Sequence, residues 1–170
     1  MASADDLPYL ETLTSRRTFD LFAVLTFISM MFLFWRWSRH QLDGWTIAYL
    51  VIFLFFLFST FNYQTLNINL TQEVLTLKFG LFRWTVPVEN IAACQIDVLP
   101  LFMRYGGAGV HFMLIDGRYR ASFNFLEYPR IVVSFKRMVG PVKDLSFSTQ
   151  NPEEIIRLIH SAIENQESSA

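Results

Sequence analysis

Charged residues are scarce in this chain of 170 residues. Asp, Glu, Lys and Arg together make up 17% of the sequence, whereas an ordinary soluble domain contains about 25%. The deficit is local, because residues 21–61 contain only Arg36, Arg39 and Asp43 as charged groups. The net charge of -1 provides no cationic excess for neutralising phosphates, so we expect no nucleic acid partner.

Residues with reactive side chains are also few. Cys94 is the single cysteine, which excludes an intramolecular disulfide, and it has no CxxC partner or zinc-like spacing. His40, His111 and His160 are far apart in the sequence. The glycine-rich segment 106–109 lacks the Lys-Ser/Thr ending of a phosphate-binding loop. We therefore expect no catalytic residues, no metal, no cofactor and no enzymatic activity.

Apolar residues are abundant and make up 52% of the chain, with 18 phenylalanines. They are concentrated in two runs, Phe19–Trp35 and Trp45–Phe61, separated by a short polar connector. Each run is near the lower limit for spanning a bilayer core about 30 Å thick, and the tryptophans at their ends suit the headgroup level. This pattern predicts a transmembrane helical hairpin over residues 19–62, preceded by a polar tail over residues 1–18.

Two other interpretations of the apolar runs are less favourable. Buried core helices of a soluble protein would need more surrounding chain than this sequence has. A cleavable signal peptide is also disfavoured, because the region before the first run carries Asp5, Asp6 and Glu11 and no small-residue cleavage site follows the run. Arg16 and Arg17 before the first run balance Arg36 and Arg39 in the connector. The free amino terminus and Lys78 then favour a cytoplasmic location for both termini and the domain that follows.

From Tyr63 the apolar pattern changes to a period of two, which is typical of half-buried strands. Asp116-Gly117 is a two-residue hairpin signal. Asn151, Pro152 and Glu154 form a helix start, and the helix that follows has one apolar face. We therefore expect a β-rich domain over residues 63–165 that ends in a helix, with residues 166–170 frayed.

Several local strings resemble bacterial pleckstrin-homology-like (PH-like) domains that follow a two-helix transmembrane hairpin. These strings are Leu75–Arg83, Val86–Ile91, Arg104–Gly109 and Leu145–Ile155. The resemblance implies an α+β membrane protein of the bacterial inner membrane, with a bent antiparallel sheet or barrel capped by the C-terminal helix. It implies binding and scaffolding rather than catalysis. The layout also looks like that of assembly factors of photosynthetic complexes.

Two groups of residues are candidates for contacts with partners or lipids. The first group is apolar or aromatic apart from one arginine and is expected at a partner or membrane interface: Leu81, Phe82, Trp84, Leu101, Phe102, Met103, Arg104 and Tyr105. The second group is basic and could contact anionic lipids: Arg118, Arg120, Lys136, Arg137 and Lys143. The turn at residues 71–73 is neutral to acidic. It therefore lacks the cations with which PH domains that bind phosphoinositides hold the headgroup.

These observations lead to three hypotheses of function. The leading one is a non-enzymatic, membrane-anchored PH-like module that scaffolds other membrane proteins or assists their assembly. The second is a permanent accessory subunit of a large energy-transducing or photosynthetic membrane complex. The third is a membrane-surface module that binds anionic lipids. The expected partners are the lipid bilayer and other integral membrane proteins, and the sequence leaves the oligomeric state open.

Overall fold

The computed structural model contains two long apolar helices, two β-sheets and a C-terminal helix. It describes residues 9–40, 43–98, 108–115 and 117–169. The elements in chain order are β1 (Tyr9–Thr14), α1 (Arg16–Ser38), α2 (Gly44–Asn62), β2 (Thr65–Leu70), β3 (Val74–Phe79), β4 (Phe82–Pro87), the 3₁₀ turn η2 (Val88–Asn90), β5 (Ile91–Ile96), β6 (Gly109–Ile115), β7 (Arg118–Asn124), β8 (Arg130–Val139), β9 (Val142–Ser148) and α4 (Pro152–Ser169). This α+β layout confirms the coarse fold that the sequence predicts.

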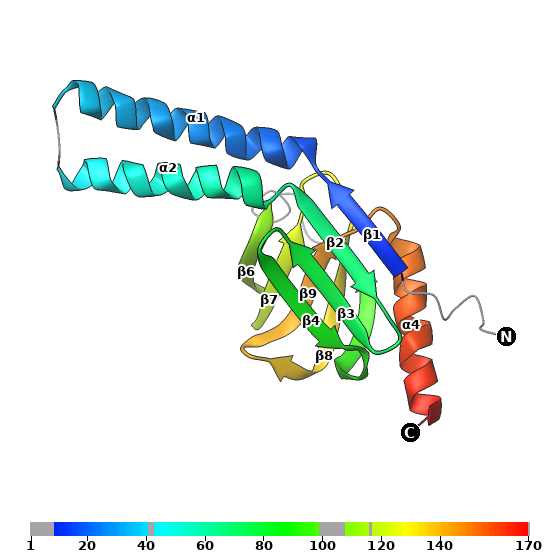
Figure 1. Ribbon diagram of the computed structural model, residues 1–170. Helices are drawn as coiled ribbons and strands as arrows, with labels where there is room; N and C mark the ends of the chain where they lie inside the picture. The colour runs from blue at the N-terminus through cyan, green and yellow to red at the C-terminus, as the bar shows by residue number, and fades with distance from the viewer. Residues whose placement is uncertain (1–8, 41–42, 99–107, 116, 170) are drawn as a thin grey trace.

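The two N-terminal helices lie side by side and project away from the β-domain (Figure 1). With 23 and 19 residues, they are about 34 Å and 28 Å long at 1.5 Å per residue. Only 17% of the residues in the most apolar part of each helix are buried. By length and composition, both helices are therefore able to cross a membrane.

Polar contacts join the two helices at both ends of the hairpin. The hydroxyls of Thr26 and Thr60 lie 3.1 Å apart in the half nearer the β-domain. At the far end, the Arg36 guanidinium donates to both carboxylate oxygens of Asp43 at 2.6 Å, and its Nε donates to Thr46 at 3.2 Å. The hydrogen bond from Arg36 holds the pKa of the Asp43 carboxyl below its usual value. The hairpin is therefore fixed by contacts of its own as well as by apolar packing.

Strand β1 lies in the segment that the sequence predicted to be a polar tail. It pairs antiparallel with β2, from Tyr9 opposite Leu70 to Thr14 opposite Thr65. Leu13 is its only fully buried apolar side chain, so the segment carries too little alternation to be recognised as a strand. The two helices are thus inserted between two strands that are neighbours in the same sheet.

Strand β1 also contacts the opposite side of the domain. The Glu11 carboxylate accepts hydrogen bonds from the Thr149 hydroxyl at 2.6 Å and from the Gln150 backbone N–H at 2.7 Å. The Tyr128 hydroxyl donates to the Thr14 carbonyl at 2.8 Å. These contacts tie the strand that enters α1 to the segments that precede β8 and α4.

The two sheets face each other across a common apolar core. The first has the order β1-β2-β3-β4 and is antiparallel throughout, and the second has the order β5-β8-β9-β7-β6. The core includes Phe79 against Phe125, with ring centroids 4.8 Å apart, and Trp84 against Phe123. The expectation of a wholly antiparallel sheet is wrong at one place, because β7 and β9 are parallel.

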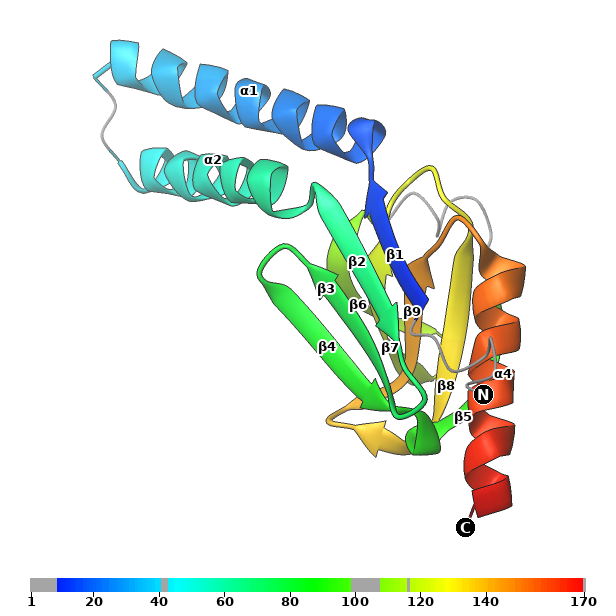
Figure 2. The ribbon, with the colours of Figure 1, turned by 45° about the vertical axis from the view of Figure 1, so that its right-hand side comes forward.

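The remaining sequence predictions for the β-domain concern a hairpin and the C-terminal helix. Strands β6 and β7 form the predicted hairpin, with Ile115 opposite Arg118; Asp116 lies outside the described residues. Helix α4 begins at Pro152 as predicted, and it buries Ile155, Ile159 and Ala162. It packs against β5, η2 and β8, as Figure 2 shows. The helix continues to Ser169, beyond the expected end at residue 165.

Candidate interaction surfaces

The residue types that commonly perform catalysis are dispersed or buried. In the part of the chain that the structure describes, no group of three or more His, Cys, Asp or Glu residues could hold a metal ion. Cys94 is 5% exposed, and burial raises the pKa of its thiol to about 12, so the thiolate nucleophile is suppressed at neutral pH. Burial, followed by the nearby charge of Arg130, lowers the pKa of His111. This histidine is therefore kept neutral inside the fold.

The outer face of the second sheet carries a buried polar cluster. The Asp97 carboxylate accepts a hydrogen bond from Arg120 at 2.9 Å and another from the Ser146 hydroxyl at 3.0 Å. The side chains of Asp97 and Arg120 are only 5% and 11% exposed. On the neighbouring strand pair, the Ser134 hydroxyl donates to Asp144 at 2.7 Å. Asp97 directly follows β5, so the cluster links the end of β5 to β7, β8 and β9.

This cluster changes the interpretation of the basic residues that were candidates for lipid contacts. Arg118 is exposed, but Arg120 is held inside the domain by Asp97. The two arginines do not form a shared exposed face. Lys136, Arg137 and Lys143 lie on the β8–β9 hairpin, where the Lys143 ammonium donates to the Lys136 carbonyl at 3.1 Å. The structure thus separates the five candidate cations into three different environments.

The apolar candidates also divide into separate groups. Leu81 and Phe82 are 80% and 41% exposed at the turn between β3 and β4. Trp84 is partly buried against the rings of Phe112 and Phe123. The other five candidates, at positions 101–105, lie outside the described residues. The turn is next to the end of α2 in both views (Figures 1 and 2), so its exposed apolar side chains continue the apolar surface of the helix.

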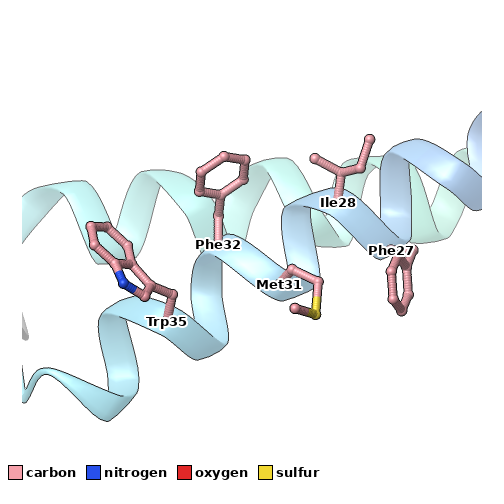
Figure 3. Close-up of a pocket in the computed structure, with 5 residues that line it drawn as sticks. All are labelled: Phe27, Ile28, Met31, Phe32 and Trp35. Carbon is pink, nitrogen blue, oxygen red and sulfur yellow. The ribbon is translucent and has the colours of Figure 1, made fainter.

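A further surface on α1 was not singled out in the sequence. Phe27, Ile28, Met31, Phe32 and Trp35 line a shallow, almost wholly apolar hollow of about 420 Å³ (Figure 3). Each of these side chains is between 45% and 58% exposed. Their spacing at i, i+1, i+4, i+5 and i+8 places them on one side of a helix. The same spacing can be read from the sequence, but it does not stand out there because the helix is apolar on all sides.

We call these five residues the α1 stripe. The opposite side of α1 contacts α2 through Thr26, whose hydroxyl lies beside that of Thr60. Of the stripe residues, Phe32 also stacks on Tyr49 of α2, with ring centroids 5.8 Å apart. Aromatic side chains and methionine are well suited to contacts with another protein, because they offer large and adaptable apolar surfaces. The α1 stripe is therefore a candidate surface for an apolar partner on this helix.

Comparison with known proteins provides no family assignment: no family model, no curated protein and no solved structure matches this chain.

Proposed function

We propose that this protein is a non-enzymatic, membrane-anchored module that scaffolds other integral membrane proteins or assists their assembly. In this proposal, α1 and α2 cross the membrane as a hairpin and the β-domain lies on one side of it. The observation that carries the proposal is the α1 stripe, an exposed aromatic surface on a helix whose other side is already occupied by α2.

The pairing of β1 with β2 supports the proposal in a second way. Both ends of the hairpin are held in adjacent strands, so the orientation of α1 is coupled to a sheet rather than to a flexible linker. A partner bound to the α1 stripe would then be positioned relative to the β-domain. Such positioning is what scaffolding and assembly require.

Membrane insertion can be tested by alkaline carbonate extraction and cysteine labelling. We expect the chain to stay in the membrane pellet at high pH. Cysteines introduced by Ser38→Cys, at the end of α1, and Glu89→Cys, in η2, should react with an impermeant reagent from opposite sides. Both positions are exposed, whereas Cys94 is buried and provides a low background. Release by carbonate, or labelling of both cysteines from one side, would contradict insertion.

The scaffolding role can be tested by purification in several mild detergents, followed by mass spectrometry. We expect integral membrane proteins to co-purify with the wild-type chain, and Phe27→Ala/Met31→Ala to reduce their recovery at least tenfold. A matched control is Val51→Ala/Phe55→Ala on α2, whose side chains are equally exposed but lie outside the α1 stripe. A wild-type chain that is recovered alone and monomeric, or equal losses in both variants, would contradict the proposal.

A permanent subunit of a large membrane complex is the second candidate. It is favoured by the exposed apolar side chains on both helices, which offer contact surfaces in more than one direction. Native gel electrophoresis separates the two roles. Stoichiometric co-migration with a mature complex supports a permanent subunit, whereas recovery only with immature complexes supports an assembly role.

A further inference from the structure

An open apolar groove of about 580 Å³ lies where α2 meets the turn between β3 and β4. Its walls are formed by Leu54, Leu57, Phe58 and Phe61 on one side and by Leu81 on the other. Figures 1 and 2 both show this turn beside the end of α2. The groove is separate from the α1 stripe, since the two surfaces share no residue.

Local contacts hold the groove in shape. Phe79 pairs with Phe82, so Gly80 and Leu81 form a two-residue turn. The Leu81 backbone N–H donates to Asn62 Oδ1 at 2.8 Å. Gly80 has a φ of +58°, and a Cβ there would lie 2.2 Å from the Asn62 carbonyl oxygen. The turn is therefore pinned to the end of α2, and glycine is needed for the close approach.

Two cations stand beside the same turn. Lys78 on β3 is directly opposite Arg83 on β4, and both side chains are exposed. Like charges in this arrangement repel each other. Within the described part of the chain, neither residue has a carboxylate within ion-pair distance. The pair thus forms a site of positive potential that an external anion would relieve.

The groove also contains a buried polar donor. Asn62 is 6% exposed and lines the groove. Its Nδ2 has no hydrogen-bond partner among the described residues, and a buried donor without a partner costs free energy. An acceptor oxygen bound near this position would satisfy it.

We propose that this groove is a binding site for one anionic phospholipid. An acyl chain lies along α2 in the groove, and the headgroup phosphate is held between Lys78 and Arg83. Ester or phosphate oxygens lie within reach of Asn62. The charge complementarity favours a lipid over an apolar helix of another protein, because a helix would leave the two cations without a counter-charge.

The proposal rests on membrane insertion of the hairpin, which is part of the proposed function, but not on scaffolding. Carbonate extraction tests insertion alone, and partner recovery tests scaffolding alone. Lipid retention, measured on the purified protein, tests only the groove. Failure of one of these three measurements is therefore distinguishable from failure of the others.

The experiment is native mass spectrometry of the full-length protein released from nanodiscs that contain equal amounts of phosphatidylglycerol and phosphatidylcholine. We expect the wild-type chain to retain one phosphatidylglycerol in preference to phosphatidylcholine. Lys78→Gln/Arg83→Gln should lower this retention roughly 25-fold, at about fivefold for each cation near a membrane. Both positions are on the surface, so this variant should fold.

Three further variants make the result specific. Lys136→Gln/Arg137→Gln removes the same charge from the β8–β9 hairpin and should lower lipid retention much less than Lys78→Gln/Arg83→Gln does. Leu54→Trp should fill the groove and remove the retained lipid, whereas Val51→Trp places the same side chain at an exposed position outside it and should leave the lipid bound. Equal retention of the two lipids by the wild type, or equal losses in the two charge variants, would overturn the proposal. So would the loss of a bound protein, rather than a lipid, in Leu54→Trp.

Discussion

The ion pair between Asp97 and Arg120 provides the sharpest test of the fold. Both side chains are nearly inaccessible, and Asp97 also accepts a hydrogen bond from Ser146. Asp97→Ala leaves the Arg120 guanidinium buried without a counter-charge, and breaking a buried pair in this way typically costs about 3–5 kcal/mol. We expect a loss of this size in the free energy of unfolding of the β-domain.

The measurement is urea-induced unfolding of the full chain in detergent micelles, followed by pulse proteolysis. The double variant Asp97→Ala/Arg120→Met removes the uncompensated charge, so it should be more stable than Asp97→Ala alone. Glu89→Ala, at an exposed position, should change the stability by less than about 0.5 kcal/mol. The reasoning is refuted if Asp97→Ala costs less than about 1 kcal/mol, or if the double variant is as unstable as the sum of the two single variants.

Three further predictions concern single positions. The folded state lowers the pKa of His111 below the ordinary 6.5, so the unfolded state binds the proton more readily and the free energy of unfolding should fall as the pH drops below about 6.5. The urea midpoint should decline less steeply with falling pH in His111→Gln than in the wild type, whereas the exposed control His160→Gln should decline as the wild type does. Identical declines in the two variants would contradict the assignment. Gly80→Ala should lower the free energy of unfolding by at least about 1–2 kcal/mol because alanine is strained in the left-handed backbone, and the clash of its Cβ with Asn62 should increase this loss. An unchanged urea midpoint would show that the turn is not held as described. Cys94 should resist iodoacetamide at pH 8 in the folded protein and react only after denaturation, because its thiol is buried and has a pKa of about 12. Rapid labelling of the native protein would disprove the burial of this thiol.

Local patterns account for most of the elements after the hairpin. The period-two alternation in β2 and β3 corresponds to Leu66, Ile68, Leu75 and Leu77 in the core. The start of α4 at Pro152 follows from residues next to one another in the sequence. Both features depend on short-range chemistry, so the sequence is sufficient to predict them.

Features set by distant contacts could not be predicted. The alternation places Arg118 and Arg120 on the same face of β7, but only the folded chain brings Asp97, the residue after β5, to Arg120. The parallel pairing of β7 with β9 depends on β8 lying on the far side of β9. The groove beside Leu81 likewise requires α2 and the β3–β4 turn to meet. The sequence suggested Leu81 as a candidate interface residue, but it could not show that α2 lies beside it.

The pairing of β1 with β2 has a consequence for how the chain is made. The two strands are adjacent in the sheet but are separated in sequence by both apolar helices. If the hairpin enters a membrane, β1 meets β2 only when both helices have inserted and returned the chain to the side from which it started. A chain that inserts one helix alone keeps β2 as an unpaired edge, which is a template for aggregation. In a chain with such an inserted hairpin, the first sheet would therefore be completed only when the membrane topology is correct.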